Sequence, residues 1–504
     1  MRLRHLAIAT ALIAVPSAAH AFCGFYVGGA GAKMFNNATE VVLMRHGTTT
    51  VLSMENNYQG PPEQFALVVP VPVVIKEDQV KTLDRSLFEK IDTLGAPRLV
   101  EYWEQDPCYQ PPPERDYPME LMEESAPADD EGGEDNDERE YHVKVEAKFS
   151  VAEYDIVVLS ATQSTGLDRW LRDNHYKIPD GAEPLLRPYI EAGTKWFVAK
   201  VDPKKVKFEN GMATLSPLRF HYDSADFTLP IRLGLANSNG TQDLIVNILA
   251  PNTRYEVANR PNAVIPTNII VKDEVRTRFG EFYAALFDHV LEKVPGAVVT
   301  EYSWDSGSCD PCPGPTLDQN DVATLGGDVI QKTYQNIDFY GYTLTRLHAR
   351  YGKEVADDLV FRAVQPIVGG RGIPDEKGNV PQGVENDSTN NFQGRYIILH
   401  PWTGAVACEA PRRGVWGGPP PSQQIAAPGT QTASNTAFVP RGKVELGSLL
   451  AQDVPAIGAT ASSTVPLPNP IRKPQGCGCA TTGGAGGALS LALGLLAFRR
   501  RRRN

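Results

Sequence analysis

The sequence contains none of the short motifs that mark common catalytic centres. It has no HExxH zinc motif, no G-x-S-x-G nucleophile turn, no G-x-x-x-x-G-K phosphate loop and no G-x-G-x-x-G following a strand. Basic residues are not in excess either, with 49 Lys and Arg against 60 Asp and Glu. The sequence therefore favours a protein that is not an enzyme. We expect no catalytic residue, metal or cofactor, and no nucleic-acid partner.

The net charge of −11 is concentrated in one segment. Glu114–Glu140 contains thirteen acidic residues and two arginines, which accounts for the whole excess. Dense like charge with few aromatic residues predicts that residues 111–140 form a disordered acidic insert. Calcium binding is the alternative, although Asp135–Glu138 lacks the ligand spacing of an EF-hand loop.

The first twenty-one residues have the pattern of a secretory signal peptide. Arg2 and Arg4 precede the apolar run Leu6–Val15, and Ala19-His20-Ala21 places small residues at the cleavage site. The predicted cut falls before Phe22, so the mature chain is exported.

The other end of the chain, residues 477–504, predicts a membrane anchor. Ala480–Phe498 has no charged residue, and as a helix it reaches about 28 Å, close to the hydrocarbon thickness of a bilayer. The arginines that follow are expected to stay on the cytoplasmic side and stop translocation; they are Arg499, Arg500, Arg501, Arg502 and Arg503. The membrane is therefore one predicted partner.

This tail resembles the myxobacterial C-terminal sorting domain MYXO-CTERM, in which a Cys motif, an apolar helix and an arginine run follow one another. The resemblance implies export, retention in the membrane, processing near the Cys motif and display on the outer cell surface. Cys477 and Cys479 are the candidates for sorting or lipid attachment. Residues 417–476 are rich in Pro, Ser, Ala and Thr and predict an extended, flexible stalk, within which Val444–Leu450 predicts a short helix.

Residues 22–416 predict an α+β domain that is largely antiparallel β-sheet with a few packed helices. Runs rich in Val, Ile, Leu and Thr predict strands, among them Thr39–Met44, Phe227–Leu235, Asp243–Ala250, Tyr342–Tyr351 and Arg395–Pro401. Asn239-Gly240 predicts a hairpin turn between the second and third of these. Glu274–Lys293 predicts one long helix with Phe279, Phe282, Leu286 and Val290 on its apolar face.

Five cysteines lie in this exported domain: Cys23, Cys108, Cys309, Cys312 and Cys408. Cys309 and Cys312 form a C-x-x-C motif with three open interpretations. A structural disulfide, within the motif or to another of the five, suits an oxidising compartment. A redox site needs Cys309 at a helix N-terminus, which Pro313-Gly314-Pro315 disfavours, and a zinc site needs further ligands. Because the count is odd, at least one cysteine is unpaired or pairs outside the domain.

Three blocks in order, Tyr302–Pro315, Thr345–Arg362 and Asn391–Cys408, together with Cys23–Phe25, resemble domain of unknown function family 2330. The resemblance spans most of Cys23–Trp416 and implies a secreted or envelope-associated bacterial protein. The family has no established activity, so the resemblance supplies no catalytic residues. A second cysteine often follows the first in the family pattern, where this chain has Tyr26-Val27, which leaves the partner of Cys23 open.

These patterns together favour an exported, surface-anchored envelope protein that is a binding or structural module. An envelope protein or a polysaccharide is the expected partner. One alternative is a secreted thiol-redox enzyme that uses Cys309 and Cys312, and another is calcium-dependent adhesion through the acidic insert. His348 and His400 are candidate catalytic partners of Cys309, but a histidine with satisfied hydrogen bonds on a strand is the more common case.

Overall fold

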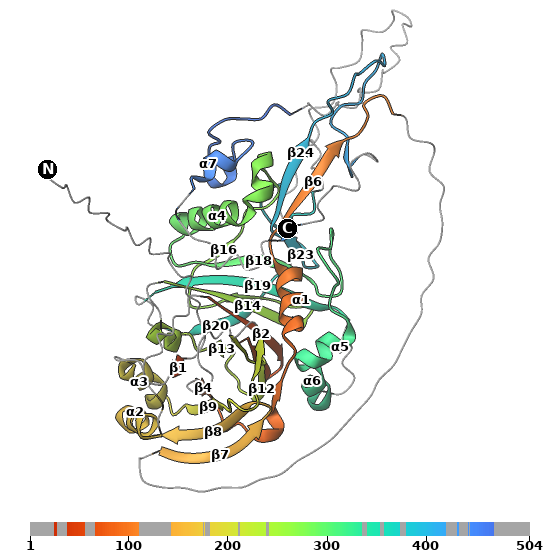
Figure 1. Cartoon of the computed structure of the whole chain (residues 1–504). Coiled ribbons are helices and arrows are strands. Elements are labelled where there is room, and N and C mark those ends of the chain that lie inside the picture. The colour runs from red at the N-terminus through yellow and green to blue at the C-terminus, as the bar shows by residue number, and fades with distance from the viewer. Residues whose placement is uncertain are drawn as a thin grey trace, which may run out of the picture.

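The fold is organised around two long neighbouring strands, β14 (Gln242–Pro251) and β19 (Tyr342–Tyr351), which pair antiparallel along their whole length (Figure 1). Both are rich in Leu, Ile, Val, Thr and Tyr, residues that pack well on a pleated surface. Both are buried over nearly their whole length because sheets and helices cover their two faces.

The computed structural model of the protein describes residues 25–27, 38–55, 66–109, 143–174, 176, 182–209, 212–237, 241–334, 340–352, 357–372, 380–419, 431–432, 442 and 444–467. The predicted signal peptide, Cys23, the acidic insert, Cys477, Cys479 and the arginine run lie outside these residues. Within them, no helix has both the length and the apolar character needed to cross a bilayer.

An eleven-stranded sheet surrounds the central pair. Its other strands are β2 (Ala38–His46), β3 (Thr49–Met54), β5 (Val80–Thr82), β12 (Leu218–Asp223), β16 (Asn262–Val264), β18 (Val298–Asp305), β21 (Ile367–Gly369), β22 (Glu385–Asn386) and β23 (Asn391–Gln393). Their order is β22-β21-β23-β18-β19-β14-β2-β3-β12-β5, and β16 pairs with β18. Most neighbours are antiparallel, whereas β2 with β14, β16 with β18 and β21 with β23 are parallel.

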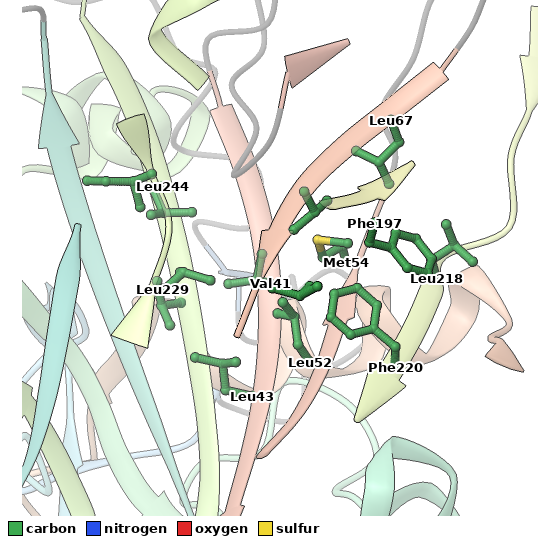
Figure 2. Packing of buried hydrophobic residues seen from close by; sticks show 14 of the residues in the cluster. Val41, Leu43, Leu52, Met54, Leu67, Phe197, Leu218, Phe220, Leu229 and Leu244 are labelled. Carbon is green, nitrogen blue, oxygen red and sulfur yellow. The ribbon is translucent and has the colours of Figure 1, made fainter. Parts of the chain in front are cut away.

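A second sheet packs against one face of the first. It comprises β1 (Phe25–Val27), β4 (Ala66–Val71), β9 (Lys195–Val201), β8 (Tyr154–Ala161) and β7 (Val143–Val151), in that order. Figure 2 shows Leu67 and Phe197 of this sheet meeting Leu52 and Phe220 of the long sheet in the main hydrophobic core. Its outer face is covered by α2 (Ser164–Asp173) and α3 (Glu183–Glu191).

Three smaller sheets and five further helices complete the described structure. One sheet consists of β13 (Thr228–Leu229), β20 (Leu359–Val364) and β15 (Arg254–Val257), and another of β10 (Lys207–Glu209) and β11 (Met212–Thr214). The third consists of β17 (Ile269–Ile270), β24 (Arg395–His400), β6 (Arg98–Glu104) and β25 (Trp416–Gly417). In this third sheet β26 (Gln431–Thr432) also pairs with β6. The helices are α1 (Arg85–Gly95), α4 (Phe279–Lys293), α5 (Gln319–Val322), α6 (Asp328–Thr333) and α7 (Leu446–Leu449).

The predicted α+β class with mostly antiparallel strands is confirmed, but two local predictions were wrong. Phe227–Leu235 contains only the two-residue β13, because Pro230 has no amide hydrogen for a ladder and the chain then forms a 3₁₀ segment, Arg232–Asn237. The predicted turn residues Asn239-Gly240 lie outside the described residues, and the two strands expected on either side of them do not pair with each other. β13 pairs with β20, and β14 pairs with β19 and β2.

The long predicted helix is shorter than expected. A 3₁₀ turn occupies Asp273–Thr277, and α4 begins at Phe279 because the backbone of Arg278 is not helical, with φ −130° and ψ 25°. The predicted apolar face is confirmed, since Phe279, Phe282, Leu286 and Val290 are all buried.

The prediction of a stalk over residues 417–476 was wrong for residues 444–467, which pack on the body. Five apolar side chains of this segment join the core beside α4, namely Leu446, Leu449, Leu450, Val454 and Ala459. The backbone is fixed as well, because Lys272 N donates to Leu449 O at 3.0 Å and Ala451 N donates to Ile270 O at 3.1 Å. The folded body therefore extends beyond the predicted boundary at residue 416.

Candidate functional site

One face of β19 carries charged residues and is nevertheless buried. Side chains alternate along a strand, so Arg346, His348 and Arg350 share one face. Leu347 and Ala349, on the other face, join the main hydrophobic core. The sequence interpretation singled out His348 alone, although the period-2 alternation was the signal that groups all three.

The neighbouring strands add carboxylates to this face. β14 contributes Asp243, which lies opposite Arg350 in the ladder. β18 contributes Glu301 from an irregularity in its pairing, because Thr300 lies opposite Leu347 while Tyr302 already lies opposite Arg346. An extra residue of this kind re-aims a side chain, and here it directs the Glu301 carboxylate toward the cations of β19.

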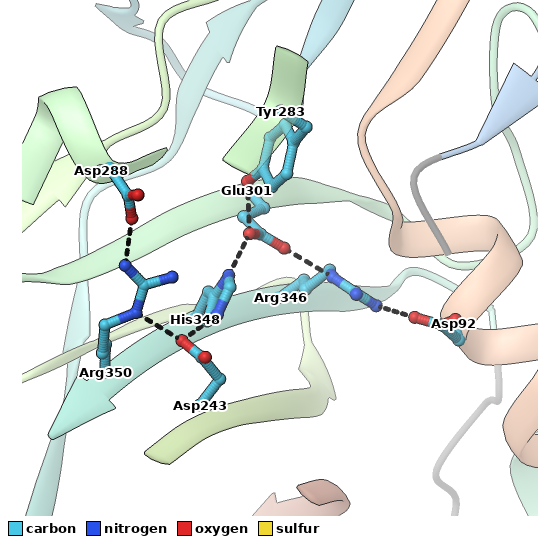
Figure 3. Close-up of polar contacts among 8 residues, drawn as sticks. All are labelled: Asp92, Asp243, Tyr283, Asp288, Glu301, Arg346, His348 and Arg350. Atoms are coloured by element: carbon cyan, nitrogen blue, oxygen red, sulfur yellow. Dashed lines mark hydrogen bonds and ion pairs between the residues drawn. The ribbon is translucent and has the colours of Figure 1, made fainter. Parts of the chain in front are cut away.

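Eight residues form one continuous network on this face, which we call the buried ionic network: Asp92, Asp243, Tyr283, Asp288, Glu301, Arg346, His348 and Arg350 (Figure 3). Glu301 contacts Arg346 Nε and His348 Nδ1, both at 2.7 Å. Asp243 contacts His348 Nε2 at 3.1 Å and Arg350 Nε at 2.8 Å. Helices supply the outer members, with Asp92 from α1 on Arg346, and Tyr283 and Asp288 from α4 on Glu301 and Arg350.

The centre of the buried ionic network is closed to solvent, whereas the outer carboxylate of Asp288 is 25% exposed. Glu301 and Asp243 are 0% exposed and His348 is 2% exposed, and the ring of Phe287 stacks on His348 at 3.9 Å between centroids. Two surface cavities, of about 230 Å³ beside His221 and about 550 Å³ between α1 and α5, are lined by other residues. The network therefore joins α1 and α4 to the central strands.

His348 lies between two carboxylates. Burial outweighs the opposing effect of Glu301, so the pKa of His348 is lowered. Ionised carboxylates only accept hydrogen bonds, so the two ring contacts each require an N–H donor. The two contacts therefore favour a protonated ring, against the larger effect of burial.

The network is expected to make folding sensitive to acid. Burial by itself raises the pKa of Glu301, but His348, Arg346 and Tyr283 outweigh burial and lower this pKa from 4.5 to about 2. A carboxyl with a depressed folded-state pKa stabilises the fold above its unfolded pKa and loses this contribution as the pH falls through the interval between the two values.

We expect the difference in unfolding free energy between the wild type and Glu301→Gln to shrink by roughly 3 kcal/mol between pH 5 and pH 2, at about 1.4 kcal/mol per pKa unit. Urea titrations at a series of pH values measure this. A difference that stays constant across the interval would show that Glu301 does not titrate in this way.

The structure pairs four of the predicted cysteines in two disulfides, Cys309–Cys312 and Cys108–Cys408. Cys309 is not at a helix N-terminus, because the next helix, α5, begins only at Gln319. The histidines proposed with Cys309 have other partners: His348 belongs to the buried ionic network, and His400 contacts Glu101 at 2.7 Å. Within the described residues, no group of His, Cys, Asp and Glu has the arrangement needed to hold a metal ion.

The Cys108–Cys408 disulfide closes the end of an extension that we call the arm: β6, β24 and the segments 105–109 and 401–417. β6 and β24 pair in parallel from Arg98 opposite Arg395 to Trp103 opposite His400. The inner half, with Leu99 and Tyr396, packs in the core beside α4, and the outer half extends beyond the body (Figure 1). The ring of Trp103 stacks on His400 at 4.6 Å.

Glu104 fixes the chain segments at the outer end of the arm. Its carboxylate accepts hydrogen bonds from Arg413 Nε at 2.8 Å, from the Gly414 amide at 2.7 Å and from the Trp402 amide at 2.9 Å. Burial acts to raise the pKa of Glu104, but the hydrogen bonds outweigh it and the pKa is lowered. A carboxylate held ionised by three donors gives the outer arm a defined shape.

The tip of the arm exposes apolar side chains. Tyr109 is 59% exposed, Val406 39% and Val415 41%. Backbone contacts hold these segments together, because Gln105 N donates to Val415 O at 2.8 Å and Arg412 N donates to Pro107 O at 2.8 Å. Half of the large apolar side chains that are exposed in the described part of the chain therefore lie on this small tip.

The fold and these features define a β-rich α+β protein with a disulfide-closed arm. The chain belongs to a bacterial family, because the family described as an uncharacterized protein conserved in bacteria (DUF2330) matches residues 17–362. This match contains Cys23, Cys309 and Cys312 but ends before the block Asn391–Cys408.

No curated protein matches the chain. Among solved structures, a mutated baculovirus P35 after caspase cleavage is similar at 13% identity and a TM-score of 0.22, over 43% of this chain. The match covers 66% of the P35 chain, just under two thirds of its length.

Proposed function

We propose that the protein is exported, is anchored at the outer cell surface and binds another envelope protein through the tip of its arm. Export is supported by the signal-peptide pattern of residues 1–21, and anchoring by the Cys motif, apolar stretch and arginines of residues 477–504. Two disulfides in the body fit an oxidising compartment outside the cytoplasm.

The observation that carries this proposal is the combination of exposed apolar side chains with a fixed backbone at the arm tip. Protein interfaces are enriched in Tyr, Trp and Arg, and the arm contains Trp103, Trp402, Trp416, Tyr109, Arg412 and Arg413. The disulfide and the Glu104 carboxylate hold the tip in one conformation, which reduces the entropy lost on binding.

We expect the triple variant Tyr109→Ser, Val406→Ser, Val415→Ser to lose at least tenfold in affinity for isolated envelope material. The removed apolar contacts supply the binding free energy, and tenfold corresponds to about 1.4 kcal/mol. Full-length protein in detergent is incubated with separated envelope-protein and cell-wall polysaccharide fractions, and retention is measured by cosedimentation.

The matched control is Val73→Ser, Tyr340→Ser, Val360→Ser, which changes the three other exposed large apolar side chains of the described residues. The control should bind the envelope-protein fraction like the wild type. Equal binding by both triple variants would reject the arm as the binding surface. Retention on the polysaccharide fraction alone would show that the partner is a polysaccharide and not an envelope protein.

A further inference from the structure

We propose that the Cys309–Cys312 disulfide is a site of thiol–disulfide exchange with a protein dithiol, and that the incoming thiolate attacks Cys312. This assignment depends on the burial, charge and anchoring of the C-x-x-C loop. It is independent of what the arm binds.

The two sulfurs of the motif differ in access. Cys312 is exposed, whereas Cys309 is half-buried and packs against the core formed by α1 and the ends of β18 and β19. The other disulfide has no comparable exposure, because Cys108 and Cys408 are both half-buried. An incoming thiolate therefore reaches Cys312 more readily than any other disulfide sulfur among the described residues.

The loop is held in place by buried side chains at the root of the arm. Arg98 Nη1 donates to Pro311 O at 2.8 Å, and Gln393 Nε2 donates to Asp310 O at 2.6 Å. Arg98 begins β6, and Arg395, opposite it in the ladder, begins β24. Both residues between the cysteines are thus fixed, which keeps Cys312 presented at the surface.

The same arginines give the loop a positive surrounding. Arg98 and Arg395 are both buried, and the negative charge of Asp310 acts on each of them, so two guanidinium groups share one carboxylate. Arg98 also contacts the carbonyls of Leu94 and Pro311. Asp310 is the carboxylate of the motif itself, and it is exposed. A guanidinium remains charged at all relevant pH values, and nearby cations stabilise a thiolate.

The exchange transfers two electrons without an additional oxidant. A thiolate of the partner dithiol attacks Cys312 Sγ, which forms a mixed disulfide and breaks the Cys309–Cys312 bond, with the electron pair leaving on Cys309 Sγ. The second thiolate of the partner then attacks the partner's first sulfur, which is bonded to Cys312 in the mixed disulfide. This step forms the partner's disulfide and releases Cys312. The partner ends as a disulfide, and Cys309 and Cys312 end as thiols after taking up the two protons of the dithiol.

The first test uses the full-length wild-type protein in detergent, with thioredoxin as the dithiol probe. After alkylation of free thiols, peptide mass spectrometry reports the state of each disulfide. We expect Cys309–Cys312 to be reduced at least tenfold faster than Cys108–Cys408, which is the internal control. Equal rates, or reduction only in denaturant, would overturn the proposal.

The second test identifies the attacked sulfur. With a thioredoxin variant that lacks its second cysteine, Cys309→Ser should form a stable mixed disulfide through Cys312 after thiol activation. Cys312→Ser should trap at least tenfold less. In Cys309→Ser, the pH profile of alkylation should give Cys312 a midpoint below the value of about 8.5 for a free cysteine. Equal trapping by the two variants, or a midpoint at or above 8.5, would show that the loop is not built for exchange.

Discussion

Arg346→Met is expected to lower the free energy of unfolding by about 3–5 kcal/mol, the usual cost of removing one partner from a buried ion pair. Arg346 lies 2.7 Å from both Glu301 and Asp92, and its own side chain is 1% exposed. Methionine fills much of the same volume, so the loss is electrostatic rather than a cavity. Two carboxylates then remain in the interior without their cation.

Urea denaturation of the wild type and the variant at pH 7 measures this change. The matched control is Arg187→Met, because Arg187 makes an exposed helical ion pair with Glu183 at 2.9 Å and its loss should not be measurable. If Arg346→Met were as stable as that control, the ion pairs of the buried network would not be ionised in the folded protein.

A buried network of this kind is weak evidence for net stability, because well-packed apolar residues are often equally stable. What it provides here is a fixed register. The irregularity at Glu301 is matched by Arg346 and His348 on the next strand, and a shift of β18 by one residue would separate the Glu301 carboxylate from both of them. We infer that the network specifies how β18, β19 and β14 align.

The sequence predicts one half of this network and not the other. The alternation in Tyr342–Tyr351 is enough, from the sequence alone, to place Arg346, His348 and Arg350 on one face of a strand. Alternating polar residues usually indicate a face in water, whereas here α1 and α4 cover it. The carboxylates come from four separate elements, and local periodicity holds no information on which distant segments meet.

The arm shows the same limit. Arg395–Pro401 is predicted as a strand, and β24 confirms it, but its partner Arg98–Glu104 lies almost 300 residues earlier and was not predicted. Parallel pairing requires no turn between the strands, so no turn signal marks it. Cysteine spacing likewise left the pairing open, since Cys108 and Cys408 are separated by 300 residues.

The composition of residues 417–476 misled the prediction for a different reason. An average over Pro, Ser, Ala and Thr conceals a short stretch with an apolar residue at nearly every third or fourth position: Leu446, Leu449, Leu450 and Val454. This spacing is the signal of a buried face. The short helix predicted over Val444–Leu450 is confirmed as α7, but its packing on the body was not predicted. A window as short as this stretch detects it, whereas a sixty-residue window does not.

We therefore expect a chain that ends at Trp416 to fail to fold, whereas a chain that ends at Leu467 folds. Each fully buried aliphatic side chain contributes about 1.5–3 kcal/mol, so losing the four in this stretch costs on the order of 6–12 kcal/mol. That is comparable to the whole stability of a typical domain, about 5–15 kcal/mol.

Both chains are exported with the native signal peptide and compared by secreted yield, protease resistance and thermal unfolding. The mechanism is specific, because the truncation removes apolar side chains from the cluster that contains Phe282 and Val290 of α4. It also removes Ile457 O, which lies 2.9 Å from His289 Nε2. The variant Leu449→Ala in the chain that ends at Leu467 keeps the full segment but removes one buried side chain. It should lower the free energy of unfolding by about 2–5 kcal/mol. If the Trp416 chain were as stable as the longer one, α4 would not need this segment, and residues 444–467 would be a detachable part of the tether.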